Sequence, residues 1–245
     1  ILEYYFSGAS DLFRAFAIWN ERIDMRQNNI VWNPTYPAEH HFPPIPVVKL
    51  DLSAFTACTS AVEANNKLAG LFQIIAAQEG VIGFDHTKHN FAMLLGLLAR
   101  HPKNEWKQVV VLIDEYDAQL TACIDKPEQY KDIRDNFLKP FFQALKTADQ
   151  HVRFCFVTGA SAYAKTSVWS GANQFVDISL DPKFATLCGF VEEEVKTLVE
   201  GSPSVDLDAL RTAYNGYQFS RDNNQPTVYN PFLIANVTSP ILDCT

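Results

Sequence analysis

The sequence predicts an α/β fold with a mostly parallel sheet, and three observations lead to this prediction. Apolar runs at 47–53, 109–113 and 152–159 are separated by stretches whose apolar residues follow helical spacing. The central run, VVVLI, does not alternate with polar residues, which is typical of a strand buried on both faces. Strands and helices that alternate along the chain are characteristic of a doubly wound parallel sheet.

The expected elements can be placed one after another. Ser60 and Glu63 form a capping-box pattern before a helix that stops near Gly80, and Pro140 is expected to kink or restart a later helix. The remaining expectations are helical pieces within 1–19, an irregular proline-rich connection at 33–46, a strand at 47–53, a helix from Phe91 to Pro102, strands at 109–113 and 152–159, helices at 191–200 and 206–214, and a tight turn at the YNGY motif.

Length and composition restrict the class of protein. The 245 residues, 47% of them apolar, predict one globular domain over 1–245. A net charge of -8 argues against a broad surface for nucleic acid or for an anionic membrane. No apolar run is long enough to span a bilayer. The five cysteines are widely spaced, which favours a reducing, intracellular location, cytoplasmic or nuclear, over a disulfide framework or zinc site.

Carboxylates follow the central strand directly. In open parallel sheets, ligands bind beyond the carboxyl ends of the strands, where Asp114 and Glu115 are expected. One acid could hold Mg²⁺ while the next orients or deprotonates an attacking water. The alternative is that both are loop acids at a solvated strand end. Asp117 is interpreted as a helix N-cap in either case.

A phosphate-binding loop would support the nucleotide hypothesis. None of the 10 glycines is followed by lysine, so the pattern G-x-x-x-x-G-K-[ST] is absent from these residues.

Several stretches together resemble one family, the AAA-ATPase-like domain of the P-loop NTPase superfamily, which a PD-(D/E)XK nuclease-like domain often follows. The stretches are VVVLIDEYDAQL (109–120), FVTGASAYAKTSVWSGANQFVDISLDPKFATLCGFVEEEV (156–195), YNGYQFS (214–220) and VYNPF (228–232), with VVKLDLS (47–53) and LFRAFAIW (12–19) similar to earlier segments. The resemblance implies a P-loop NTPase-like three-layer sandwich. In that family the Walker A motif and the first strand, which lies in the middle of the sheet, precede the segment similar to residues 1–8.

The resemblance also implies site residues and cofactors. Asp114 corresponds to the Walker B metal ligand, Glu115 to the catalytic base, and Thr158 and Ser161 to the polar region near the γ-phosphate or the attacking water. The cofactors would be Mg²⁺ and ATP. No chemical role follows for Asn173 or for the YNGY motif. The chain departs from the family at three positions, where Ala162 replaces a basic residue, Gln174 a second asparagine and Val191 a capping threonine.

Two functions follow as expectations. The first is Mg²⁺-dependent ATP binding and hydrolysis in the intact protein, with ATP as ligand and a nuclease-like domain as a partner in the same longer chain. The second is a catalytically inactive NTPase-like interaction module that does not bind ATP, which the missing Walker A motif and Ala162 favour.

Overall fold

The computed structural model describes residues 45–160, 168, 175–199 and 206–238. The chain divides into two compact units, Ile1–Gln174 and Phe175–Thr245, and each is described by itself. The expected single domain over 1–245 stays a prediction. Several sequence-based expectations fall outside the described residues, namely the helical pieces within 1–19, most of the connection at 33–46, and the residues Ser161, Ala162, Asn173 and Gln174.

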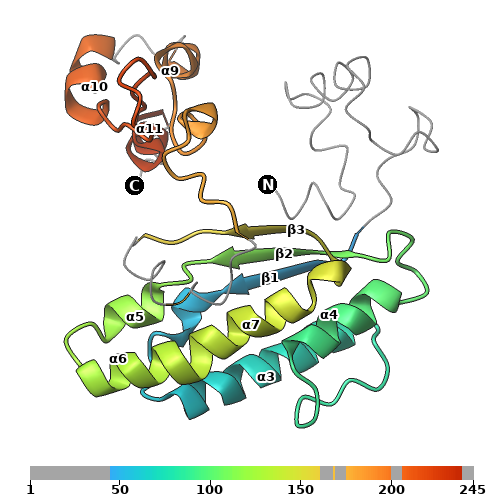
Figure 1. Cartoon of the computed structure of the whole chain (residues 1–245). Helices are drawn as coiled ribbons and strands as arrows, with labels where there is room; N and C mark the ends of the chain where they lie inside the picture. Colours follow the sequence, from blue (N-terminus) through green and yellow to red (C-terminus); the bar gives the residue numbers. More distant parts are fainter. Residues whose placement is uncertain (1–44, 161–167, 169–174, 200–205, 239–245) are drawn as a thin grey trace, which may run out of the picture. The chain divides into compact units, whose positions relative to one another are not determined.

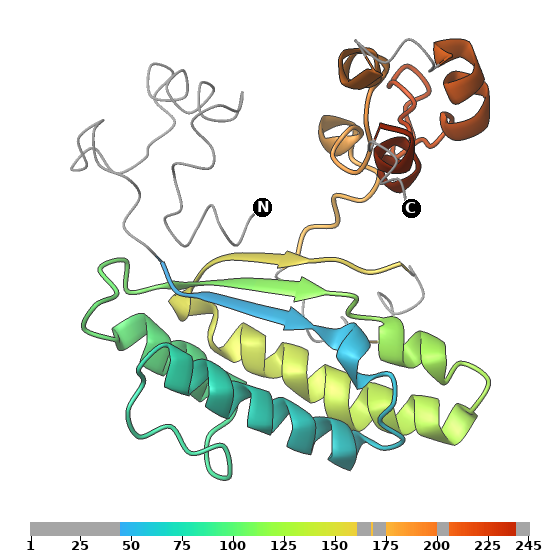
Figure 2. The same ribbon diagram turned by 180° about the vertical axis from the view of Figure 1, so that it is seen from behind.

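The described residues of the first unit form a three-stranded, fully parallel sheet in the order β1-β2-β3. The strands are β1 (Val47–Asp51), β2 (Val109–Asp114) and β3 (Val152–Val157). Their arrowheads point in one direction, so the three carboxyl ends share one edge (Figure 2). The mixed α/β class with a parallel sheet is therefore confirmed, and it is consistent with a P-loop-like fold.

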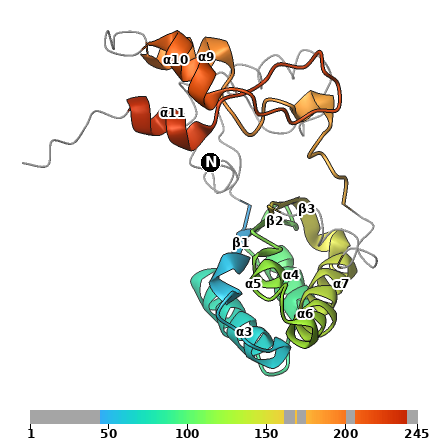
Figure 3. The same ribbon diagram turned by 90° about the vertical axis from the view of Figure 1, so that its left-hand side faces the viewer.

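Helices connect the strands and pack on one face of the sheet (Figure 1). The view along the sheet shows α3, α4 and α7 on the same side of the strands (Figure 3). The connection from β1 to β2 contains η2 (Leu52–Phe55), α3 (Ala61–Gln78) and α4 (Phe91–Arg100), and the connection from β2 to β3 contains α5 (Ala118–Ala122), α6 (Pro127–Ile133), η3 (Arg134–Leu138), α7 (Lys139–Thr147) and η4 (Asp149–His151).

The ends of α3 follow the predicted signals. The Ser60 hydroxyl accepts a 3.3 Å hydrogen bond from the Glu63 amide, as an N-cap does. The Glu63 carboxylate reaches one residue further back than the predicted capping box requires, because it accepts from the Thr59 amide at 2.8 Å. Gly80 follows the helix with φ +71°, a conformation that glycine adopts without a steric cost, and confirms the predicted stop.

Pro140 interrupts the long helix as the sequence predicts. The five residues of η3 form a π-helical turn directly before α7, which has Pro140 in its first turn. Because proline has no N–H, it cannot donate to the Asn136 carbonyl four residues earlier. The Asn65 side chain of α3 donates to that carbonyl instead, at 3.0 Å. A side chain of the neighbouring helix α3 therefore supplies the hydrogen bond that the Asn136 carbonyl loses at the break.

The core lies between the sheet and its helices. Val48 and Leu50 on β1, and Val111 and Ile113 on β2, are almost fully buried on the face that the helices cover. The largest side chains that complete this core are Leu52, Phe55, Leu94, Leu95, Leu98, Ile133, Phe137, Leu138 and Phe142.

The strand expected at 152–159 is present as Val152–Val157, but the expectation that it is buried is wrong, because its residues are half-buried or exposed. Arg153 and Phe154 are exposed, and Phe154 retains 37% of its accessible surface. The physical reason is position, because β3 pairs only with β2 among the described strands and its Phe154 faces away from the helices. Cys155 faces the helices, and burial raises the pKa of its thiol to about 12.

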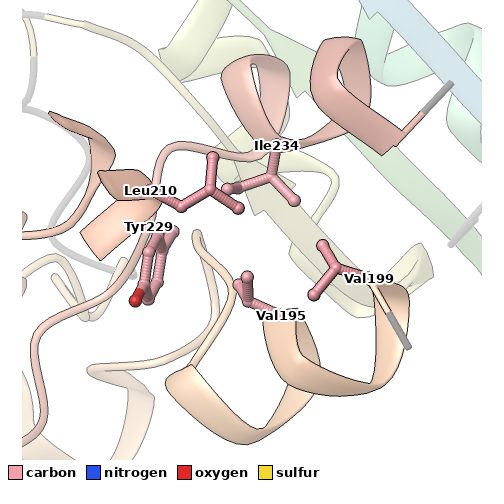
Figure 4. Close-up of a cluster of buried hydrophobic side chains, with 5 residues drawn as sticks. All are labelled: Val195, Val199, Leu210, Tyr229 and Ile234. Carbon is pink, nitrogen blue, oxygen red and sulfur yellow. The ribbon is translucent and has the colours of Figure 1, made fainter. Parts of the chain in front are cut away.

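The second unit has its own small core. Its helices are η6 (Pro182–Phe184), α9 (Glu192–Val199), α10 (Leu207–Tyr214) and α11 (Pro231–Thr238), so the helices expected at 191–200 and 206–214 are confirmed. Five buried side chains from three helices and one bridge strand point toward one another (Figure 4). They are Val195, Val199, Leu210, Tyr229 and Ile234.

The YNGY motif is not the tight Asn-Gly turn that was expected. Such a turn needs a positive φ at asparagine, and Asn215 has φ -89° as the residue that ends α10. Only Gly216 is in the left-handed region, with φ +117°. The next residue, Tyr217, forms an antiparallel bridge with Val228. The motif therefore leads from a helix into a β-bridge that joins 214–220 to 228–232.

Candidate functional site at the carboxyl edge of the sheet

The acids predicted from the sequence lie at the carboxyl edge of the sheet. Asp114 is the last residue of β2, the central strand of the three, and Glu115 follows it. Both residues are exposed. The structure therefore places two carboxylates where ligands bind in open parallel sheets.

Thr158 joins the end of β3 to the end of β2. Its amide donates to the Ile113 carbonyl at 2.8 Å, and its own carbonyl accepts from the Tyr116 amide at 3.0 Å. The Thr158 hydroxyl donates to Oδ1 of Asp114. Two residues predicted separately, 44 positions apart in the chain, are thus in direct contact.

The Asp114 carboxylate is oriented through one of its oxygens. Oδ1 accepts from the Thr158 hydroxyl and, at 3.0 Å, from the Glu115 amide. Within the described part of the chain Oδ2 has no hydrogen-bond donor. The site therefore holds one carboxylate oxygen in place and leaves the other available to a ligand.

Glu115 has an unusual backbone conformation. Its φ is +48°, in the left-handed region that side chains with a Cβ seldom adopt. Strained residues of this kind are concentrated at functional sites, where the surrounding structure fixes them. The Glu115 amide donates to Asp114, and its carbonyl accepts from the Ala118 amide at 3.0 Å. Among the described residues no group is hydrogen bonded to the Glu115 carboxylate.

The interpretation of Asp117 as a helix cap is wrong. Asp117 occupies the N-cap position of α5, but its carboxylate accepts no hydrogen bond from that helix. It is 2% exposed, and Oδ1 accepts from the Ala160 amide at 3.1 Å. Asp117 therefore fixes the segment after β3, a role that sequence spacing cannot reveal because the partner is 43 residues away.

Gly159 permits the loop after β3 to lie close to Tyr116 and Asp117. A Cβ at this position would lie 2.4 Å from Cε1 of Tyr116 and 2.5 Å from Oδ1 of Asp117. Contacts shorter than 3 Å do not occur between such atoms without displacement of one of them. The loop after β3 thus packs directly on the loop after β2, and this packing keeps Thr158 beside Asp114.

Asp51 was not predicted as a site residue. It ends β1 and is the register partner of Asp114 on the neighbouring strand. The signal was present in the sequence, since an acid follows the apolar alternation of the strand expected at 47–53.

The chemistry of the edge suits a hard cation. Carboxylate and hydroxyl oxygens are the ligands that Mg²⁺ prefers, usually one or two carboxylates with water and phosphate oxygens. Among the described residues no group of three or more His, Cys, Asp or Glu side chains could hold a metal ion by itself. Asp114 and Thr158 offer a carboxylate oxygen and a hydroxyl oxygen, the kinds of ligand that Mg²⁺ takes in proteins.

No helix in the described part of the chain is long and apolar enough to cross a membrane.

The mixed α/β fold with its parallel sheet is consistent with a P-loop-like protein. The chain belongs to the AAA-ATPase-like family. The sequence profile of that family, described as "Predicted AAA-ATPase", matches residues 1–169, including Asp51, Asp114, Glu115, Thr158 and Ser161. YNGYQFS and VYNPF lie beyond the matched residues.

One curated relative is described as an "Uncharacterized protein in vnfD 5'region" of Azotobacter chroococcum mcd 1. It is 34% identical over 174 residues, which are 70% of this chain and 32% of the relative. The chain thus spans about a third of that protein's length. No solved structure matches the chain.

Proposed function

We propose that the protein in its natural full length binds Mg²⁺ and ATP and hydrolyses ATP at the carboxyl edge of this sheet. The observation that supports the proposal is the convergence of Asp114, Glu115 and Thr158 at the ends of two neighbouring strands, with the Thr158 hydroxyl bonded to the Asp114 carboxylate. Membership of the AAA-ATPase-like family gives this convergence its chemical interpretation.

Each side chain has a distinct task in this proposal. Asp114 holds the cation through Oδ2, the oxygen that accepts no hydrogen bond from the described residues. The Glu115 carboxylate accepts a proton from the attacking water, a task that an exposed carboxylate can perform. Thr158 positions Asp114 and presents its hydroxyl toward the phosphate side. Mg²⁺, when bound, would supply positive charge that stabilises the phosphate oxygens during phosphoryl transfer.

Ser161 is proposed as a further contact to the γ-phosphate or water from its position in the motif, because it lies outside the described residues. A nuclease-like domain in the same longer chain and an intracellular location stay predictions.

The decisive experiment compares Mg²⁺-ATP binding and hydrolysis by the natural full-length protein and its Glu115→Gln variant. The wild type should show thermal stabilisation by Mg²⁺-ATP, which reaches about 2.7 kcal/mol at a hundredfold excess over the dissociation constant. Glu115→Gln should retain this stabilisation while kcat falls by about a hundredfold or more.

Glu79→Gln is the matched control, because Glu79 is an exposed glutamate at the end of α3. It should leave both binding and kcat unchanged. A full-length protein that shows no binding of ATP by calorimetry would refute the proposal and would favour the second candidate, an NTPase-like interaction module without catalysis.

A further inference from the structure

Asp117 connects the two loops that carry the proposed site. It lies at the start of α5, two residues after Glu115, and α5 follows the arrowhead of β2 (Figure 1). Its carboxylate accepts a 3.1 Å hydrogen bond from the amide of Ala160, which lies two residues beyond Thr158 on the segment after β3. Asp117 is 2% exposed. A buried carboxylate therefore joins two segments that are 43 positions apart in the chain.

The bond to Ala160 restrains the segment after β3 beyond the last backbone pairing with the β2 side. The Thr158 amide donates to the end of β2 at 2.8 Å, and the Thr158 carbonyl accepts from the Tyr116 amide at 3.0 Å. The next residue, Gly159, has no side chain, and a glycine backbone has more conformational freedom than that of any other residue. The Asp117 carboxylate therefore fixes the chain on the far side of Gly159.

One oxygen of Asp117 serves both residues that follow Thr158. Oδ1 accepts from the Ala160 amide, and a Cβ at Gly159 would lie only 2.5 Å from the same oxygen. A buried carboxylate costs free energy unless it accepts hydrogen bonds, and α5 donates none to this side chain. The position of the segment after β3 is thus coupled to the satisfaction of a buried acid.

We infer that Asp117 is a positioning residue of the cation site, which keeps the Thr158 hydroxyl in contact with the Asp114 carboxylate through its bond to Ala160. The inference rests on the proposed function, in which Asp114 holds the cation. The rotamer of a side chain depends on the backbone conformation at its own residue, so the restraint at Ala160 bears on the direction of the Thr158 hydroxyl. Groups that orient a metal ligand from outside affect the affinity for the metal.

The test is a double-mutant cycle on the natural full-length protein. It measures Mn²⁺ affinity by electron paramagnetic resonance, with the metal alone as the probe, so that no catalytic activity is needed. Asp117→Ala should weaken Mn²⁺ binding about fivefold, and Thr158→Val should weaken it about tenfold. The double variant should bind within about twofold of Thr158→Val, because Asp117 acts through the hydroxyl that valine has already removed.

Two further variants separate positioning from stability. Asp117→Asn keeps an oxygen that can accept from the Ala160 amide, and its Mn²⁺ affinity should remain within about twofold of the wild type. Asp132→Ala is the matched control, because Asp132 also accepts from the backbone amide of a distant residue, Ala61, at 2.8 Å. It should lower the melting temperature in EDTA and leave the Mn²⁺ affinity of the folded protein within about twofold of the wild type.

The outcomes separate this inference from the proposed function. If Asp114→Asn weakens Mn²⁺ binding while Asp117→Ala binds as the wild type does, only this inference fails. It also fails alone if the losses at Asp117 and Thr158 multiply to about fiftyfold in the double variant, because the two residues then act independently. If Asp114→Asn leaves the affinity unchanged, the cation site fails, and both the proposed function and this inference fail with it.

Equal losses in Asp117→Asn and Asp117→Ala would also overturn the inference, because an acceptor for the Ala160 amide would then have no effect. Melting temperatures in EDTA show whether each variant folds. Asp117→Ser replaces Asp117→Ala if the alanine variant does not fold, because serine can cap α5 while its shorter side chain leaves the Ala160 amide without its acceptor.

Discussion

The backbone amide of Ala160 donates a 3.1 Å hydrogen bond to the carboxylate of Asp117, and Asp117 is 2% exposed. This bond joins the segment after β3 to the start of α5. Asp117→Ala and Asp117→Ser should therefore both lower the free energy of unfolding by about 1–3 kcal/mol, because each leaves a partly buried amide without its acceptor.

The Asp117→Ser variant distinguishes the bond to Ala160 from a capping role. Serine and aspartate are equally good N-caps, so a capping role would let Asp117→Ser keep nearly all of the stability. Urea unfolding of the two variants side by side distinguishes the roles. If the serine variant is as stable as the wild type, Asp117 acts as a helix cap and the bond to Ala160 contributes little.

Gly159 should not tolerate alanine. The added Cβ would lie 2.4 Å from Tyr116 and 2.5 Å from Asp117, both of them buried, so Gly159→Ala should destabilise the protein by about 1–3 kcal/mol. Gly70→Ala is the control, because it lies inside α3 with no atom within 4 Å of the new Cβ. It should stabilise by about 0.5–1 kcal/mol. Urea unfolding measures both, and equal effects would contradict the packing described at Gly159.

The Thr158 hydroxyl should matter more than the shape of its side chain. Thr158→Val keeps the volume and removes the donor to Asp114, so Mn²⁺ affinity in the full-length protein should fall about tenfold. Thr158→Ser keeps a hydroxyl and should remain within about threefold of the wild type. Titration followed by electron paramagnetic resonance provides the measurement. Equal Mn²⁺ affinities for the valine variant and the wild type would show that the Thr158 hydroxyl does not contribute to cation binding.

Glu192 should make the stability of the second unit depend on pH in the acidic range. Hydrogen bonds from the Arg211 guanidinium and the Tyr229 hydroxyl hold the pKa of Glu192 at about 2, below its usual 4.5. A lowered pKa means that the stabilising contribution is complete above the unfolded-state pKa and is lost as the pH falls through the folded-state pKa. The stability advantage of the wild type over Glu192→Gln should therefore shrink between about pH 4.5 and pH 2.

Urea unfolding of both proteins at several pH values in this window tests the prediction. Asp208→Asn is the control, since Asp208 contacts the same Arg211 through a carboxylate that is 86% exposed, and exposed ion pairs contribute little. An advantage that stays constant down to pH 2 would contradict the assigned cause.

A substitution at Val191 should raise the stability of the second unit. Val191 precedes α9, and its amide donates to the Glu194 carboxylate at 2.9 Å, which is one half of a capping box. Valine cannot supply the other half, so Val191→Thr should stabilise the second unit by about 1 kcal/mol. Val62→Thr, at an exposed position inside α3, is the control and should change the stability by less than about 0.5 kcal/mol. Thermal unfolding compares the two variants, and equal shifts would exclude a cap at Val191.

The elements that depend on local pattern were predicted well. The cap at Ser60, the stop at Gly80 and the break at Pro140 depend on residues within a few positions of one another, so the sequence shows both partners. The errors have a common cause. Asp117 and the YNGY motif have partners that are distant in the chain, namely Ala160 and Val228, and local patterns contain no information about them.

The site follows the same division. The sequence by itself determined that Asp114 and Glu115 end a buried strand, because an apolar run stops at those acids, and that the chain is α/β. Only the tertiary structure decided that Thr158 binds Asp114 and that Asp51 is its neighbour across the sheet. The reason is that parallel strands bring their carboxyl ends to one edge through long connections, and the order and register of those strands are set by packing of the whole core, which no short stretch of sequence encodes.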